Sequence, residues 1–392
     1  MDISIIIVSY NVKYYLEQCL HSVIRAAQVG KLSWEVFVVD NASQDGSIEH
    51  LKQCFPTASY PMIHNIANAR NVGFSRANNQ AVELAKGKYI LFLNPDTILA
   101  ETTLSEAVTF ANQHENLGAI GVKMLNDCGI FAKESRRSMP TPWVSFCRMS
   151  GLTTLFPKSK TFGRYYASYL DKTQSHEIEI LSGAFMFTSS TAIKQCGAFD
   201  EDFFMYGEDI DLSYRLLKSG FTNYYIPSNI LHYKGESTHK NSYRYTHVFY
   251  EAMLIFFRKH YGHLSWIFTF PIKCAIIFRA ALTIIKQQIS NIQPNFEDKL
   301  HFAFVGSRKN FDDATNVAKK WQIGIHYAGE NLSQTLSLGT LPKETTHLLI
   351  DTTVISYEDT LNSFENSAHQ QVMAFYYPQQ FRIVTGTEIY HL

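Results

Sequence analysis

The chain has 392 residues, the length of about two to three ordinary domains. Hydrophobic residues make up 46% and aromatic residues 14% of it, which is enough to build cores and excludes a largely disordered chain. The 35 basic and 35 acidic side chains cancel. This balance argues against a dedicated nucleic-acid-binding protein, so no nucleic-acid partner is expected.

The cysteines and the first residues predict a location. The six cysteines are scattered and include no Cys-x-x-Cys pair. That distribution fits neither a zinc site nor a disulfide framework and is typical of a reducing cytosol. Met1 and Asp2 lead directly into an apolar run without a basic segment, so we expect no secretory signal and a cytoplasmic protein.

The first hundred residues alternate between the periodicities of strands and helices. Short apolar runs predict buried strands at 3–8, 36–39, 62–66 and 89–93. Apolar residues at helical spacing predict helices at 16–27, 48–55 and 77–85. Strands separated by such helices indicate an α/β fold with a parallel sheet flanked by helices. Ligands of these sheets bind beyond the carboxyl ends of the strands, where Asp40 and Asp96 both fall.

The rest of the chain changes character twice. Further strands are expected near 119–124, 184–188 and 222–226, with a loop-rich stretch at 136–180. A second α/β pattern begins near residue 300, with strands at 302–307, 323–327, 347–351 and 372–376 and a helix at 312–321. We therefore predict three parts: a catalytic domain at 1–242, a basic aromatic helical segment at 243–296, and a small α/β domain of unknown function at 297–392.

Asp40 closes an apolar strand and is followed by the polar turn 41–47. A carboxylate at that place can accept hydrogen bonds from ribose hydroxyls or from a base N–H, and a helix N-terminus behind it suits a phosphate. The same residue types are those that turns and helix N-caps prefer. Taken alone, this motif favours the structural role.

Asp96 follows the strand at 89–93 within Asn94-Pro95-Asp96-Thr97. A hard divalent cation is typically held by one or two carboxylates together with substrate phosphates, and Pro95 stiffens the turn. A capped turn explains the same residues equally well. His232, on the apolar stretch 230–233, is by itself more typical of a core histidine than of a metal ligand at a loop rim.

The segment 199–212 contains six acids interleaved with large aromatic residues. Apolar spacing places Glu208, Asp209 and Asp211 in the first turn of a helix, where the macrodipole stabilises acids without any function. A merely solvated acidic face would not carry so many aromatic side chains, and apolar neighbours raise the pKa of a carboxylate and make it a usable base. The segment alone therefore favours a functional role.

Seven motifs in one order resemble the family 2 glycosyltransferases, in particular their rhamnosyltransferase-like bacterial branch. The resemblance covers roughly residues 1–240. The motifs are Ile7-Val8-Ser9-Tyr10-Asn11, Val38-Val39-Asp40-Asn41-Ala42-Ser43, Arg70-Asn71-Val72-Gly73-Phe74, Leu93-Asn94-Pro95-Asp96, Gly183-Ala184-Phe185, Gly207-Glu208-Asp209-Ile210-Asp211 and His232-Tyr233-Lys234-Gly235-Glu236-Ser237.

The resemblance implies a GT-A fold and a role for each matching residue. Asp209 matches the catalytic base, with Glu208 and Asp211 as supporting acids. Asp96 matches the metal-binding carboxylate of the D-x-D motif, and His232 matches a histidine that completes the metal shell in some members. The expected nucleotide-sugar-binding residues are Ser9, Tyr10, Asn11, Asp40, Asn41, Ser43, Asn71, Gly73, Asn94 and Gly183.

The first position of the D-x-D motif is Asn94 here, which departs from the family because a neutral amide is a poorer ligand for a hard cation. The resemblance implies an inverting, Mg²⁺- or Mn²⁺-dependent transfer from a nucleotide-diphosphate sugar to a glycan or lipid-linked acceptor in cell-surface polysaccharide synthesis. Two alternatives are a nucleotidyltransferase, which should carry a glycine-rich phosphate loop after the first strand, and a catalytically silent nucleotide-sugar-binding scaffold at a membrane assembly.

No acidic residue lies between Glu251 and Glu297, an interval that holds five lysines and arginines and many aromatic residues. Lys273 and Arg279 interrupt the apolar run, and Pro271 bends it, so a transmembrane helix is not expected. The composition predicts an amphipathic pair of helices resting on an anionic membrane surface, which would make the protein peripheral on the inner face of the cell membrane. The alternative is a helical hairpin that packs on the catalytic domain.

Overall fold

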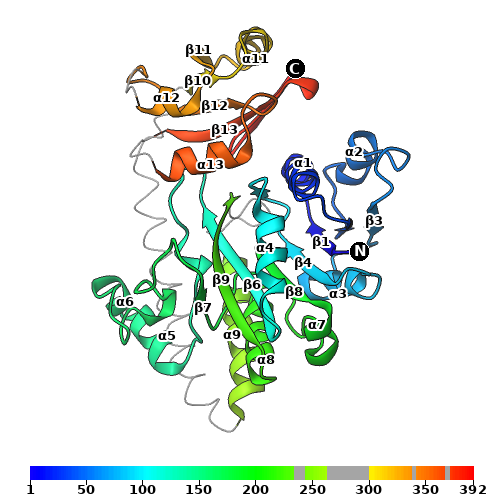
Figure 1. The fold of residues 1–392 in the computed structure, drawn as a ribbon, viewed down its shortest axis with the longest axis vertical. Helices are drawn as coiled ribbons and strands as arrows, with labels where there is room; N and C mark the ends of the chain where they lie inside the picture. The colour runs from blue at the N-terminus through cyan, green and yellow to red at the C-terminus, as the bar shows by residue number, and fades with distance from the viewer. Residues whose placement is uncertain (234–242, 263–299, 338–340, 367–370) are drawn as a thin grey trace.

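The computed structural model describes residues 1–233, 243–262, 300–337, 341–366 and 371–392 (Figure 1). Within them the chain forms a nine-stranded sheet, whose main path runs β3-β2-β1-β4-β8-β6-β9-β5, and a six-stranded sheet of order β11-β10-β12-β13-β14-β15. Helices flank both sheets, so the expected α/β fold class is confirmed.

The first half of the large sheet is entirely parallel. Its strands are β1 (Ile3–Ser9), β2 (Trp34–Asp40), β3 (Ile63–Ala67) and β4 (Tyr89–Leu93). The helices α1 (Lys13–Val29), α2 (Ser47–Cys54) and α3 (Phe74–Val82) connect them. Every residue of β1 is buried, as expected for a parallel strand that is covered on both faces. All four strands lie within two residues of their predicted ranges.

The second half of the sheet mixes directions. β8 (Phe185–Ser189) runs antiparallel to β4 and to β6 (Leu117–Leu125), and β9 (Thr222–His232) is parallel to β6. Two short strands, β5 (Thr97–Leu99) and β7 (His176–Glu177), pair antiparallel with β9. As a consequence, β8 begins where β4 ends, and the end of β9 lies beside Thr97.

The remaining helices cover this second half. They are α4 (Thr103–Asn112), α7 (Ser190–Cys196), α8 (Glu208–Lys218) and α9 (Tyr243–Tyr261). The stretch expected to be loop-rich also contains α5 (Pro142–Met149) and α6 (Leu152–Leu155), which lie to one side of the sheet (Figure 1). Short 3₁₀ turns at Lys133–Ser135 and Arg164–Tyr166 flank these two helices.

The C-terminal sheet has its own parallel core. β11 (Gly324–Gly329), β10 (His301–Val305), β12 (His347–Asp351) and β13 (Val372–Tyr377) are parallel, whereas β14 (Arg382–Val384) and β15 (Ile389–His391) return antiparallel. The helices of this part are α11 (Arg308–Lys320), α12 (Leu332–Ser337) and α13 (Tyr357–Glu365). The strands at 302–307, 323–327, 347–351 and 372–376 were therefore placed almost correctly.

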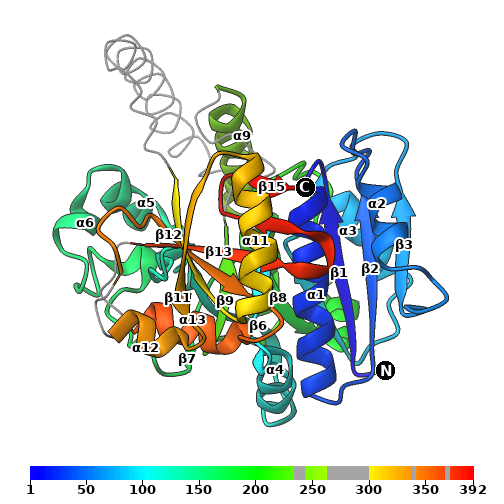
Figure 2. The same cartoon turned by 90° about the horizontal axis from the view of Figure 1, so that it is seen from above.

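The two sheets pack against each other and share a hydrophobic core. Tyr15, Leu231 and Tyr233 pack in one cluster with Leu348 and Phe375. Figure 1 and Figure 2 show the C-terminal sheet lying across α1 and the end of β9. Glu101, from the large-sheet region, accepts hydrogen bonds from the first backbone N–H groups of α13, which adds a polar contact to this interface.

The helix α9 packs on the large-sheet region. Ala252, Phe256 and Phe257 are buried in a cluster with Phe203 and Ile210. The structure thus packs residues 243–261 of the predicted segment 243–296 on the large-sheet region. Residues 263–296, with Pro271, Lys273 and Arg279, lie outside the described residues. Among the helices that the structure describes, none is both long and apolar enough to cross a membrane.

Candidate active site

The carboxyl ends of β1 and β2 present two buried polar atoms. Ser9 and Asp40 are paired residues of these parallel strands, so their side chains emerge on the same face of the sheet. Within the described part of the chain, Ser9 Oγ and Asp40 Oδ1 are both buried without a hydrogen-bond partner. Buried polar atoms are normally satisfied, so these two atoms on one face of the sheet are candidates for binding a ligand.

The loops after β1 and β2 hold each other in place. Asn11 donates from its backbone N–H to Ser43 Oγ at 2.9 Å, and Asn11 Oδ1 accepts from Gln44 N at 2.7 Å. The other oxygen of Asp40, Oδ2, accepts from Ser43 N at 2.9 Å. Asn11 and Ser43, both expected to bind the nucleotide, thus shape the rim, while the adjacent Tyr10 is exposed.

Asn41 and Asn71 use their side chains within the protein. Asn41 Nδ2 donates to Asn71 Oδ1 at 3.0 Å, and Asn41 Oδ1 accepts from Val72 N at 3.0 Å. Gly73 donates from its N–H to Asn71 Oδ1, also at 3.0 Å. The φ of Gly73 is 89°, and a Cβ built there would lie 2.8 Å from the carbonyl oxygen of Phe204. These residues therefore join the loop 68–73 to β2 and to the acidic segment.

Asp96, His232 and Asn94 meet where β4 ends and β9 ends. His232 Nε2 lies 3.4 Å from Asp96 Oδ1 and 3.4 Å from Asn94 Nδ2. Asp96 is buried, and its carbonyl oxygen accepts from Tyr233 N at 3.0 Å. A carboxylate oxygen and an imidazole nitrogen this close are compatible ligands for Mn²⁺, and a carboxylate also suits Mg²⁺. Asn94 faces His232, so its amide belongs to this cluster.

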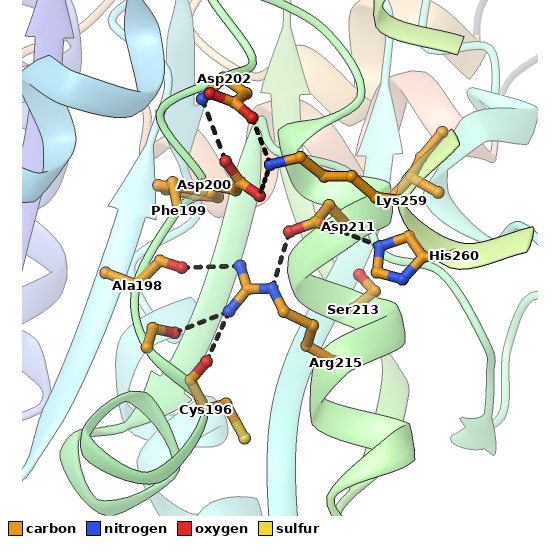
Figure 3. Close-up of polar contacts among 12 residues, drawn as sticks. Cys196, Ala198, Phe199, Asp200, Asp202, Asp211, Ser213, Arg215, Lys259 and His260 are labelled. Carbon is orange, nitrogen blue, oxygen red and sulfur yellow. Dashed lines mark hydrogen bonds and ion pairs between the residues drawn. The ribbon is translucent and has the colours of Figure 1, made fainter. Parts of the chain in front are cut away.

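The acidic segment 199–211 is mostly neutralised by cations of the same chain. Asp200 and Asp202 both pair with Lys259 of α9, and Glu201 pairs with Arg76 of α3 at 2.9 Å. Figure 3 shows the Lys259 pairs beside α8. These three acids therefore fasten the segment to α3 and α9, which is a structural role.

Asp211 is the most enclosed of the acids in α8. It accepts from His260 Nε2 at 2.6 Å and from Arg215 Nε at 2.7 Å, and Arg215 also donates to the carbonyls of Cys196 and Ala198 (Figure 3). Burial raises the pKa of Asp211, but the hydrogen bonds and charges of His260 and Arg215 outweigh burial and lower it. Asp211 thus connects α8 to α9 and, through Arg215, to the loop after α7.

Asp209 differs from its neighbours because one of its partners, Gly183, lies just before β8 begins. Its Oδ2 accepts from Arg137 Nη2 at 2.5 Å and from Gly183 N at 3.1 Å, and its Oδ1 accepts from Ile210 N at 2.8 Å. The Asp209 side chain keeps 15% of its surface accessible. Arg137, which also donates to the carbonyl of Leu181, was not among the predicted site residues. Its place in a loop-rich stretch far along the chain gave no local signal.

Glu208 is buried beside Asp209, and its Oε2 has no hydrogen-bond partner among the described residues. Burial, followed by the negative charge of Asp209, raises the pKa of Glu208 to about 8. The effect of burial on the pKa of Glu208 has the direction that the sequence predicts for an acid of this segment. A left-handed backbone at Tyr206 and Gly207 turns the chain into α8 just before this pair.

A short path of backbone contacts connects the two clusters. Asn94 N donates to the carbonyl of Ala184 at 3.0 Å, and the preceding residue, Gly183, donates to Asp209. The structure thus links the Asp96–His232 pair to Asp209 through the start of β8. The Ser9–Asp40 pair lies at the ends of β1 and β2, and β1 is the strand next to β4.

A second group of possible metal ligands lies elsewhere. Glu17, His50 and Cys54 have ligand atoms within 4.8 Å of one another, between α1 and α2. Glu17 there also pairs with Arg382 of β14, so a cation already occupies its carboxylate. The sequence spacing of these residues gave no zinc motif, and the group contains none of the predicted site residues.

Known proteins resemble this chain in the region that builds the site. The model of the family described as "Glycosyl transferase family 2" matches residues 4–197. This region of the chain is a glycosyltransferase family 2 domain. Its match to an N-acetylglucosaminyl-diphospho-decaprenol L-rhamnosyltransferase of Mycobacterium tuberculosis is 26% identical over 274 residues and covers 67% of this chain and 85% of that protein. The resemblance predicted from the seven motifs is confirmed.

Further similar proteins are sugar transferases by their names. This chain is 29% identical over 218 residues to the low-salt glycan biosynthesis hexosyltransferase Agl10 of Haloferax volcanii. The match covers 55% of this chain and 61% of that protein. A solved structure of a mannosyltransferase from Pyrobaculum calidifontis with GDP-Man and Mn²⁺ aligns with a TM-score of 0.45 and 17% identity. That alignment covers 66% of this chain and 63% of the mannosyltransferase, less than two thirds of its length.

Proposed function

We propose that this family 2 protein is an inverting, metal-dependent glycosyltransferase. It moves a sugar from a nucleotide-diphosphate donor to a hydroxyl of a glycan or lipid-linked acceptor in cell-surface polysaccharide synthesis. The observation that carries the proposal is the contact of Asp209 with Gly183, because it brings a carboxylate from α8 to the strand ends where Asp96 and His232 meet.

The donor nucleotide is assigned to the ends of β1 and β2. Asp40 Oδ1 and Ser9 Oγ are free to accept hydrogen bonds from ribose hydroxyls or a base N–H, since neither has a partner among the residues described. Tyr10 stands exposed beside them and offers a ring for stacking. Asn41, Asn71 and Gly73 act indirectly by fixing the loop 68–73 beside these strand ends.

Asp96 and His232 are the residues that would hold a divalent cation, with Asn94 beside them. A bound Mg²⁺ or Mn²⁺ would stabilise the charge that develops on the leaving diphosphate, a contribution of several kcal/mol. The Asp96 carboxylate and the His232 ring also orient each other directly, which holds both side chains at the strand edge.

Asp209 is assigned as the base that accepts the proton of the acceptor hydroxyl. General base catalysis typically contributes about 10²–10⁴-fold to the rate. The guanidinium of Arg137 contacts Asp209 Oδ2 and fixes the orientation of this carboxylate. One base and an in-line attack on the anomeric carbon lead to inversion. The name of the Mycobacterium tuberculosis relative supports a diphospholipid-linked acceptor.

The test uses the full chain with Mn²⁺, a short-chain lipid-diphosphate-linked N-acetylglucosamine acceptor, and a panel of UDP, GDP and dTDP sugars. Release of nucleoside diphosphate and donor affinity are both measured. Asp209→Asn should slow release by about 10²-fold or more while the donor Kd changes by less than about twofold. Asp202→Asn is the matched control, because Asp202 pairs with Lys259 at the surface and should retain full activity.

Two results would contradict the proposal. Full turnover by Asp209→Asn would remove Asp209 as the base. Unchanged turnover after chelation with EDTA would remove metal from the reaction, and a wild-type chain that binds a donor but releases no nucleoside diphosphate with any acceptor would favour the silent scaffold.

A further inference from the structure

The helices α5 and α6 carry an unusual density of exposed apolar side chains. Trp143 is 48% exposed, Phe146 55%, Leu155 71% and Phe156 52%, all within fourteen residues. These four residues form what we call the α5–α6 patch. Figure 1 shows both helices at one side of the molecule. Isolated exposed apolar residues are ordinary, but contiguous ones mark interaction surfaces.

Ring contacts show that the patch is contiguous. The ring centroids of Trp143 and Phe146 lie 5.8 Å apart in a stacked arrangement. Phe162 joins the two ends, because its ring lies 6.2 Å from Trp143 and 5.6 Å from Phe156. The aromatic side chains therefore pack on one another while remaining accessible to solvent, and together they present one apolar surface.

The surroundings of the patch are basic. Residues 135–170 contain no aspartate or glutamate and six lysines and arginines, although the whole chain has a net charge of zero. Arg148, Lys158 and Lys160 are exposed. Arg148 lies over the rings of Tyr165 and Tyr166, and in the described part of the chain no carboxylate pairs with Lys158 or Lys160. Exposed aromatic and aliphatic residues rimmed by basic ones match an anionic bilayer interface.

The patch is attached next to the proposed base. Arg137 and Ile180 exchange backbone hydrogen bonds at 3.2 and 3.0 Å, and the excursion that carries α5 and α6 leaves and returns at this pair. Arg137 contacts Asp209, and Ile180 is three residues before Gly183, which also contacts Asp209. The excursion that carries the α5–α6 patch is therefore anchored at residues that contact the proposed base or lie next to one that does.

We infer that the α5–α6 patch is the surface on which the protein docks to an anionic lipid bilayer. Trp143, Phe146, Leu155 and Phe156 enter the interfacial region, and Lys158 and Lys160 contact lipid phosphates. A second copy of the chain is the weaker occupant, because a two-fold dimer through this patch would place its basic rims against each other. The inference goes beyond the transfer reaction, since docking does not depend on which sugar is moved.

Sedimentation with vesicles tests the inference on the full chain. Wild-type protein should bind vesicles of phosphatidylcholine with phosphatidylglycerol and bind phosphatidylcholine alone much more weakly. Lys158→Glu/Lys160→Glu should lower the partition coefficient by about 30-fold or more, since each basic residue at the surface contributes about 1 kcal/mol. Trp143→Ala/Phe146→Ala should lower it by about tenfold or more. Lys319→Glu/Lys320→Glu, on α11, is the matched charge control and should bind like wild type.

A spectroscopic readout locates the contact. Brominated phosphatidylcholine, mixed with phosphatidylglycerol, should quench tryptophan fluorescence in wild-type protein, and Trp143→Phe should lose most of that quenching while it still sediments with vesicles. Equal binding by the patch variants and wild type would overturn the inference, and so would patch-dependent dimers that form without lipid. Melting temperature and nucleotide-sugar binding of each variant show that it is folded, so that loss of docking and loss of the transfer site are distinguished.

Discussion

The strand ends and the acidic segment both gather polar side chains, but they satisfy them differently. At the ends of β1 and β2, Ser9 Oγ and Asp40 Oδ1 are buried without a partner in the described residues. In the segment 200–211, five of the six acids pair with a cation of the same chain. Composition alone would rank the acidic segment as the stronger binding site.

This difference separates carboxylates that support the fold from polar atoms that we propose to bind a ligand. A paired, buried carboxylate such as Asp211 supports two neighbouring elements, and its removal leaves their charges uncompensated. An unpaired buried atom costs free energy in the unliganded protein and is repaid when a ligand supplies the partner. Asp209 is paired like the structural carboxylates, because Arg137 orients it, but part of its surface stays accessible.

The largest expected effect is on stability, from Asp211→Asn. Removing this charge leaves Arg215 and His260 without their carboxylate in a buried place, so the free energy of unfolding should fall by about 3 kcal/mol. Urea denaturation measures it. Because the pKa of Asp211 is lowered in the folded state, the stabilisation is present above the unfolded pKa near 3.8 and is lost as the pH falls through the folded value. A change below about 1 kcal/mol would contradict the structural role of Asp211.

The next effect is on donor binding, from Asp96→Asn. Loss of the carboxylate should raise the donor Kd in the presence of Mn²⁺ by about 100-fold, the size of a lost charge-assisted ligand contact. The same variant should bind donor without Mn²⁺ as wild type does. Titration calorimetry with and without Mn²⁺ measures both values. A Mn²⁺ enhancement equal to that of wild type would show that the metal does not rest on Asp96.

A smaller effect is expected on the pH dependence of stability, from Glu208→Gln. Burial raises the pKa of Glu208 from 4.5 to about 8, so the folded protein binds more protons than the unfolded chain in this interval. The stability of wild-type protein should therefore decrease as the pH rises from 4.5 to 8, and Glu208→Gln should flatten that decrease. Thermal unfolding across this pH range measures the slope. Identical slopes in both proteins would refute the assignment.

The smallest effect is expected from Glu201→Gln at the surface. Its pair with Arg76 is exposed to solvent on both sides, and such pairs contribute about 0–1 kcal/mol. Urea denaturation should give a midpoint close to that of wild type. A loss as large as that of Asp211→Asn would mean that exposure does not distinguish the pairs of the acidic segment.

Sequence reasoning worked where local patterns decide the structure. The parallel strands β1, β2 and β4 follow from β-branched and aliphatic runs, and the strand-end positions of Asp40 and Asp96 follow from them. Short strands such as β5 and β14 were missed because three residues carry too little periodicity to be recognised. Their pairing is decided by long-range contacts, as in the antiparallel match of β5 with the end of β9.

The residues of the candidate site were predicted together with their roles, but which of them bond within the protein was not. Asn41 and Asn71 belong to family motifs, yet their amides bond to each other. Arg137 was missed, because its contact with Asp209 spans 72 residues of sequence and no local pattern reveals it. Pairing and burial are properties of the folded chain, so they separate structural from binding residues only once the fold is known.

Titration calorimetry of the nucleotide sugar into Asp40→Asn tests whether Asp40 binds the donor. Asp40 Oδ2 serves Ser43 and can be replaced by the amide oxygen, whereas Oδ1 has no partner among the described residues. If Asp40 binds the donor, the donor Kd should rise by about tenfold or more. The melting temperature should then equal or exceed that of wild type. An unchanged Kd with a lowered melting temperature would place Asp40 among the structural carboxylates and contradict the account.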